Sequence, residues 1–166
     1  MTRQARATSR IEDELFRLGA DIVGFGDLGE LPENVRSGMP VGISVAVLYP
    51  KEVIRGISEL PTMEYRMWYD KLNERLDSIV VNGAEALRRM GFNAIAQTRE
   101  RVGSGEIGNS TTLPHKTIAT RAGIGWIGKS ALLVTAEYGS AIRLSSILTD
   151  APLDTAQATD KSRCGN

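Results

Sequence analysis

One run of eight residues, at positions 42–49, limits most strongly the folds that are open to this chain. The run is almost entirely apolar, is rich in residues that favour β-strands, and is closed by Pro50. A strand that is apolar on both of its faces is typical of the interior of a sheet that other elements cover above and below. The run therefore predicts a layered domain built around this strand.

Helical periodicity predicts three helices around that strand. The clearest extends from an N-cap at Thr62 to a stop at Gly91, with apolar residues every three or four positions. Another begins with a capping box at 9–12 and ends at Gly19, and a short one spans 113–122. The long helix thus has one apolar stripe to bury against the rest of the domain.

Further strands are predicted at 21–25, 93–97, 131–135 and 142–149. The last two are close enough in sequence to form a hairpin with each other. Residues 27–40 and 99–112 are expected to be loops, and the residues from 154 onward a loose polar tail. Because helices and strands alternate, we expect an α/β (α+β) fold with a mixed β-sheet flanked by helices.

Composition narrows the functional classes. The 166 residues suit one domain, and 20 basic residues balance 20 acidic ones, which argues against a dedicated nucleic-acid or acidic-membrane binder. One cysteine and one histidine exclude a disulfide framework and a complete Cys/His zinc site. The chain does not start like a secretory signal and has no run long enough to span a bilayer, so a cytoplasmic protein with no membrane partner is expected.

A glycine-rich segment at 123–130 reads GIGWIGKS and matches both G-x-G-x-x-G and G-x-x-x-x-G-K-[ST]. Both nucleotide-binding motifs need a strand before the glycines and a helix after them, whereas the sequence predicts the reverse. A P-loop nucleotide-binding protein therefore stays a less favoured alternative. Three glycines in six residues let the backbone approach a flat or anionic ligand on which Trp126 can stack; the competing interpretation is a tight turn with Trp126 packed in the core.

The same segment carries a family resemblance. RAGIGWIGK at 121–129, followed by LTDAPL at 148–153, is similar to the epoxyqueuosine reductase family and related 4Fe-4S double-cluster proteins, distant kin of corrinoid-dependent reductive dehalogenases. The resemblance implies a nitroreductase-like layered domain that holds cobalamin, followed by a ferredoxin-like part with two iron–sulfur clusters. The candidate cofactor-binding residues are then Asn109, Gly125, Trp126, Gly128, Lys129, Ser130, Leu133 and Leu144.

Two departures from the family pattern modify what the resemblance implies. Counting back twelve residues from Arg121, where the family's epoxide reductases place a proton-donating Asp, reaches Asn109, and an amide cannot deliver a proton as a carboxylic acid can. Cys164 resembles the first ligand of a cluster motif, but a [4Fe–4S] cluster needs four ligands. We therefore expect residues 1–153 to form a corrinoid-binding domain and 154–166 to be the stump of a missing ferredoxin-like iron–sulfur domain.

These observations favour the N-terminal domain of an oxidoreductase related to epoxyqueuosine reductase, which binds a corrinoid but does not turn over alone. A non-catalytic structural or interaction module of the same fold is the alternative. The expected partners are the corrinoid and an iron–sulfur domain or another electron donor, whereas tRNA is not expected. The sequence does not decide the substrate, whether a flavin replaces the corrinoid, or whether the chain forms a homo-oligomer. His115 is expected to have a surface or capping role, and Arg143 either meets a ligand or pairs with Asp150 or Glu137.

Overall fold

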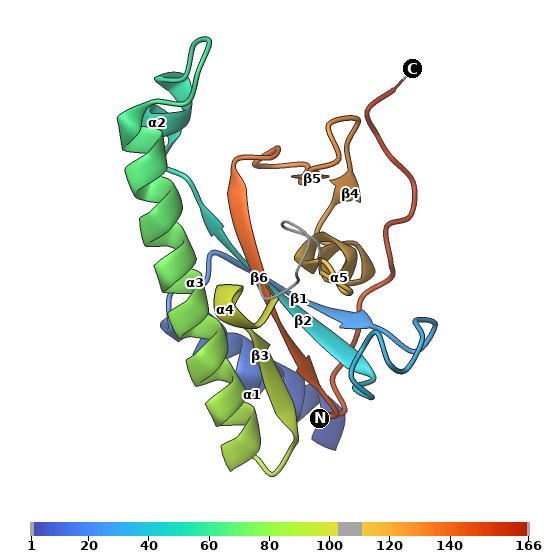
Figure 1. The fold of residues 1–166 in the computed structure, drawn as a ribbon. Helices are drawn as coiled ribbons and strands as arrows, with labels where there is room; N and C mark the ends of the chain where they lie inside the picture. The colour runs from blue at the N-terminus through green and yellow to red at the C-terminus, as the bar shows by residue number, and fades with distance from the viewer. Residues whose placement is uncertain (1, 103–110, 166) are drawn as a thin grey trace.

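The computed structural model describes residues 2–102 and 111–165 of the chain (Figure 1). Its elements, in chain order, are α1 (Arg3–Arg17), β1 (Ile22–Asp27), β2 (Val41–Leu48), α2 (Lys51–Arg55), α3 (Met63–Arg89), β3 (Ala94–Gln97), α4 (Arg99–Val102), α5 (His115–Arg121), β4 (Trp126–Ile127), β5 (Leu133–Val134) and β6 (Ile142–Thr149). The expected α+β class, with a sheet flanked by helices, is confirmed.

The main sheet has the strand order β1-β2-β6-β3, and every pair of neighbours is antiparallel. The expectation of a mixed sheet was therefore wrong, because β6 enters between β2 and β3 and runs opposite to both. As predicted, β2 is an interior strand, and seven of its eight residues are buried. β6 pairs with β2 from Ile142 to Thr149 but with β3 only from Ser146 onward. Residues 142–145 consequently have a strand partner along one edge only within the described chain.

Helices cover the two faces of this sheet. Helices α1 and α3 pack over one face and α5 over the other (Figure 1). The α5 face is lined by residues with small or absent side chains: a Cβ on Gly42 would lie 2.8 Å from Ile118 Cγ2, and a Cβ on Gly26 would lie 2.7 Å from the carbonyl carbon of Arg121. α5 therefore rests close to the strands because glycines leave room for it.

The ends of α3 agree with the sequence analysis, whereas the start of α1 does not. The Thr62 hydroxyl accepts a hydrogen bond from the Tyr65 N–H, and Gly91, with a φ of +90°, follows the C-terminus of α3. α1 begins with an N-cap at Thr2 rather than at Ser9, and its first two turns already bury Ala7. The capping box at 9–12 thus lies inside a helix that an earlier cap has started.

Two expectations about the last third of the chain were wrong. β5 pairs with β4 in a small separate sheet instead of forming a hairpin with β6. The residues after 154 are not loose, because the Ala156 N–H donates to Phe25 O at 2.9 Å and the Thr159 N–H donates to Thr120 O at 2.9 Å. The tail therefore runs along β1 and α5 toward β4 (Figure 1).

No helix in the described part of the chain is long and apolar enough to cross a membrane.

Candidate functional site

A cavity of about 520 Å³ opens beside the half of β6 that β3 leaves unpaired. α3, α4 and α5 contribute to its walls, together with the segment at 131–133 that leads into β5. Its polar lining residues include Tyr69, Asn73, Arg99, His115, Lys116 and Arg143, and its apolar ones include Leu133, Ile142 and Leu144. The cavity thus combines an apolar wall with a basic, hydrogen-bonding one, as ligand sites commonly do.

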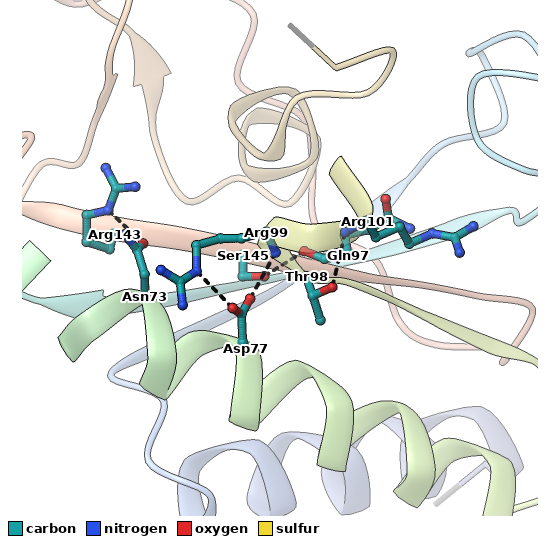
Figure 2. A network of polar contacts seen from close by, with 8 residues as sticks. All are labelled: Asn73, Asp77, Gln97, Thr98, Arg99, Arg101, Arg143 and Ser145. Atoms are coloured by element: carbon teal, nitrogen blue, oxygen red, sulfur yellow. Dashed lines mark hydrogen bonds and ion pairs between the residues drawn. The ribbon is translucent and has the colours of Figure 1, made fainter. Parts of the chain in front are cut away.

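Arg143 crosses from β6 to α3 on the basic side of the cavity. Its Nε donates to Asn73 Oδ1 at 3.1 Å (Figure 2). Its guanidinium lies 4.3 Å from the centre of the Tyr69 ring. The expected alternative of an ion pair with Asp150 or Glu137 was wrong, because Asp150 accepts hydrogen bonds from Asn93 instead. Arg143 therefore has hydrogen-bonding and ring contacts but no acidic partner in the described chain.

The short helix α4 is fastened to α3 next to this contact. Asp77 accepts hydrogen bonds from the Arg99 backbone N–H at 3.0 Å and from Arg99 Nε at 2.9 Å (Figure 2). At the end of β3, the Ser145 hydroxyl donates to Gln97 O at 3.1 Å, which ties β6 to the chain just before α4. The expected loop at 99–112 therefore begins with an anchored helical turn.

His115 is turned toward the sheet rather than toward solvent. Its Nδ1 lies 2.8 Å from the hydroxyl oxygen of Ser146, and the side chain lines the cavity. Burial, reinforced by the nearby positive charge of Arg143, lowers the pKa of His115 to about 4, and Asp77 opposes the shift. The imidazole is consequently neutral at pH 7, and the expected surface or capping role was wrong.

The glycine-rich segment does not form a nucleotide loop. It starts at the end of α5 and contains β4, and β5 rather than a helix follows it. A Cβ on Gly125 would lie 2.2 Å from Val134 O, and the Gly128 N–H donates to Leu132 O at 2.8 Å. The P-loop interpretation was therefore wrong, since these two glycines permit the close pairing of β4 with β5.

On the outer side of that pairing, the tail meets the glycine-rich segment. The Trp126 indole N–H donates to Cys164 Sγ at 3.3 Å, and Trp126 is half-buried rather than packed in the core. Hydrogen bonds from the Ser162 hydroxyl, the Trp126 indole and the Lys129 backbone N–H lower the pKa of the exposed Cys164 thiol. The described residues include no group of three or more His, Cys, Asp or Glu side chains that would hold a metal ion.

The structure separates the candidate cofactor residues into three places. Leu133 and Leu144 line the cavity. Gly125 is buried just before β4, against Val134 of β5, and Ser130 lies in the exposed turn that connects β4 with β5. Trp126, Gly128 and Lys129 gather around Cys164. Asn109 lies outside the described residues.

Sequence reasoning missed three residues of the basic wall, Tyr69, Asn73 and Arg99. A signal for two of them was present: Tyr69 and Asn73 stand four residues apart, with Asp77 four residues further on, in a row beside the apolar stripe of the helix. A polar row at helical spacing next to a buried stripe marks side chains that reach the edge of the core.

No family model matches the chain. Among curated proteins, the epoxyqueuosine reductase of Pseudomonas aeruginosa is 26% identical across 97% of this chain and 52% of its own length. The epoxyqueuosine reductase of Listeria monocytogenes is 51% identical over 42 residues, which is 25% of this chain and 11% of that protein. The chain spans about half the length of the first of these relatives, and the match to the second is confined to a short stretch of both proteins.

Solved structures agree on the fold. A catabolic reductive dehalogenase matches with a TM-score of 0.76 and 18% identity over 96% of this chain and 23% of its own. A reductive dehalogenase described with a mechanism for B12-dependent dehalogenation matches with a TM-score of 0.66 and 16% identity over 99% of this chain and 22% of its own. An epoxyqueuosine reductase solved with a tRNA stem loop gives a TM-score of 0.59 and 20% identity over 96% of this chain and 49% of its own. The chain is thus a homologue of epoxyqueuosine reductases over part of their length, with a fold that they share with reductive dehalogenases.

Proposed function

We propose that this chain is the corrinoid-binding domain of a reductase related to epoxyqueuosine reductase. The observation that carries the proposal is the agreement between its sequence relatives, which are named epoxyqueuosine reductase, and a fold match to a dehalogenase whose description names B12. When bound, a corrinoid supplies a redox-active cobalt for the reduction of a substrate. The chain has no excess of basic residues, which does not favour tRNA as a partner.

The cavity offers surfaces that suit the edge of a corrinoid ring. Leu133 and Leu144 belong to a buried apolar cluster with Ile142 and provide an apolar wall for a flat ring. Lys116, whose Nζ donates to Ala131 O at 2.9 Å, stands at the cavity with further N–H groups to offer to amide side chains of the ring. In this proposal Leu133 and Leu144 pack on the ring and exclude water, and Lys116 orients its periphery.

Unlike a corrinoid, a [4Fe–4S] cluster does not fit the residues of this chain. Such a cluster is held by four ligands, usually all thiolates, and the sequence contains one cysteine. We therefore propose that electrons come from an iron–sulfur domain or another electron donor, and that the chain alone does not turn over. Residues 1–153 would hold the corrinoid. The tail at 154–166 would face the donor through Cys164, next to Trp126, Gly128 and Lys129 of the glycine-rich segment.

One observation favours the alternative, a non-catalytic module of the same fold. The space in front of Gly125 is filled by the Val134 carbonyl, so that glycine has a structural reason to be present without any ligand. The two functions differ in one measurable respect, which is whether the chain binds a corrinoid.

The test is a titration of the 166-residue chain with cob(II)alamin, followed by visible absorption and by the thermal unfolding midpoint. Leu144→Glu places a charge on the apolar wall, and Leu60→Glu, at a site that is 77% exposed and does not line the cavity, is the matched control. We expect wild type and the Leu60 variant to bind and the Leu144 variant to bind at least tenfold more weakly. Absence of binding by wild type would overturn the proposal in favour of the non-catalytic module, and undiminished binding by a folded Leu144 variant would overturn the placement in this cavity.

A further inference from the structure

Three cationic side chains, Arg99, Lys116 and Arg143, line the same cavity, and its described lining residues include no carboxylate. They come from three different elements, α4, α5 and β6, so the fold rather than the local sequence gathers them. Like charges brought together in a partly buried site repel one another unless something compensates them.

Within the described chain, an acidic side chain balances the positive charge of only one of these three cationic residues. The charge of Arg99 is balanced by Asp77, at 2.9 Å. Lys116 donates to the neutral carbonyl of Ala131, and Arg143 contacts the neutral Asn73 amide and the Tyr69 ring. Two of the three positive charges at the cavity therefore have no acidic partner among the described residues.

Among the described residues, the guanidinium of Arg143 is held in place with its terminal nitrogens free to bind a ligand. Its Nε is used by Asn73, and its terminal nitrogens have no hydrogen-bond acceptor in the described chain and point away from α3 (Figure 2). Stacking on Tyr69 holds the guanidinium plane. A guanidinium fixed in this way offers two parallel N–H donors, the geometry that suits a carboxylate or a phosphate.

Asn73 supplies an independent observation. The side chain is only 3% exposed, its Oδ1 is occupied by Arg143, and its Nδ2 has no hydrogen-bond partner. A buried N–H donor without an acceptor destabilises the fold and is uncommon in native proteins. Asn73 lines the cavity, and its Nδ2, which has almost no accessible surface in this arrangement, meets an acceptor that enters there once the amide shifts toward the cavity.

We propose that this cavity is a binding site for an oxyanion, the carboxylate or phosphate group of a small ligand, held by Arg143 and Lys116 and by the Nδ2 donor of Asn73. The site consists of polar residues of the same cavity whose apolar lining includes Leu133 and Leu144. It goes beyond the corrinoid proposal and does not depend on it, since binding of the oxyanion requires no corrinoid.

His115 provides a direct reporter of the bound anion. It lines the cavity, and because the chain has one histidine, its imidazole signals are unambiguous in an NMR spectrum. The charged groups that face it are Arg143 on β6 and Asp77 on α3, with Lys116 beside it on α5. An anion bound between these cations changes the field at the imidazole and therefore its chemical shifts.

The experiment titrates the corrinoid-free 166-residue chain at pH 7 with inorganic phosphate, butyrate or butyramide, at constant ionic strength set with sodium chloride. We expect at least one of the two anions to shift the His115 signals saturably, which identifies the preferred oxyanion, and the neutral amide of the same shape as butyrate not to do so. Arg143→Gln is expected to weaken anion binding at least tenfold, and Arg55→Gln, an exposed arginine on α2 away from the cavity, to leave it unchanged.

A second variant tests the proposal in case Arg143→Gln impairs folding. Asn73→Asp is nearly isosteric and puts a carboxylate against Arg143, so the anion is expected to be excluded while the protein stays folded. The proposal is overturned if neither anion gives a saturable shift, if butyramide gives the same shift, or if a folded Arg143→Gln or Asn73→Asp protein binds as tightly as wild type. These outcomes are separate from the cobalamin titration, because no corrinoid is present.

Discussion

The fold places the imidazole of His115 close to the positive charge of Arg143, and this proximity disfavours a second positive charge on the imidazole. A histidine exposed to water has an ordinary pKa of 6.5, and burial beside a positive charge moves it to about 4. The protein therefore keeps a hydrogen-bonding ring at the cavity that does not add to the positive charge at neutral pH. The Ser146 hydroxyl, at 2.8 Å, fixes the ring in place.

This shift predicts a loss of stability in acid. Because the folded state disfavours the charged imidazole, the stabilisation is complete above pH 6.5 and is lost as the pH falls from 6.5 toward 4. Between pH 7 and pH 4.5 we expect wild type to lose about 2 kcal/mol more unfolding free energy than His115→Gln, which can still contact Ser146 but does not titrate. Urea unfolding measures the difference, and an NMR titration midpoint for His115 near 6.5 would contradict it.

At the scale of elements, the short pairing of β4 with β5 depends on an absent side chain. The Val134 carbonyl oxygen lies 2.2 Å from the position that a Cβ on Gly125 would occupy. Backbone cannot yield as the end of a flexible side chain can, so any other residue at 125 must push the two strands apart. This pairing places Leu133 at the cavity, so the shape of the cavity also depends on the absence of a side chain at position 125.

We expect Gly125→Ala to lower the free energy of unfolding by about 1–3 kcal/mol, the usual cost of an inserted methyl group in a packed site. Gly56→Ala is the control, because its new Cβ would meet its nearest neighbours at an ordinary 3.5 Å and its φ is −74°. That change should stay within about 0.5 kcal/mol of wild type. Equal urea midpoints for the two variants would show that the β4–β5 contact is not as tight as described.

The elements themselves could largely be predicted from the sequence, whereas their pairing could not. The limits of α3 follow from local signals, a capping hydroxyl at Thr62 and a left-handed glycine at 91. The partner of β5 is decided by packing between residues distant in sequence, which a periodic pattern does not encode. The cavity was missed for the same reason, since Arg143 meets Asn73 across 70 positions of sequence.

For the whole molecule, the tail is the segment that connects distant parts. The chain leaves the sheet at Thr149, and the tail runs past β1 and α5 toward β4 (Figure 1). It hydrogen-bonds to β1 through Ala156 and to α5 through Thr159, and Cys164 reaches Trp126. β1 is a strand at the edge of the sheet, and the hydrogen bond from Ala156 occupies the Phe25 carbonyl on that edge.

Hydrogen exchange tests this arrangement. The amides of Ala156 and Thr159 each donate to a backbone carbonyl, whereas the Lys161 amide has no hydrogen-bond partner within the described chain. We expect the first two to exchange at least tenfold more slowly than Lys161, after correction for intrinsic rates, when measured by NMR. Uniformly fast exchange along the tail would mean that it does not stay on β1 and α5.

A final consequence concerns β3, which accompanies only half of β6. In the part of the chain that the structure describes, β6 is paired on both edges only from Ser146 to Thr149, and the cavity-lining side chains of Asn73, Lys116 and Arg143 lie toward the half that is paired with β2 alone. Replacing those side chains leaves the strand register untouched. The residues that shape the cavity are therefore largely separate from the strand pairing that holds the sheet together.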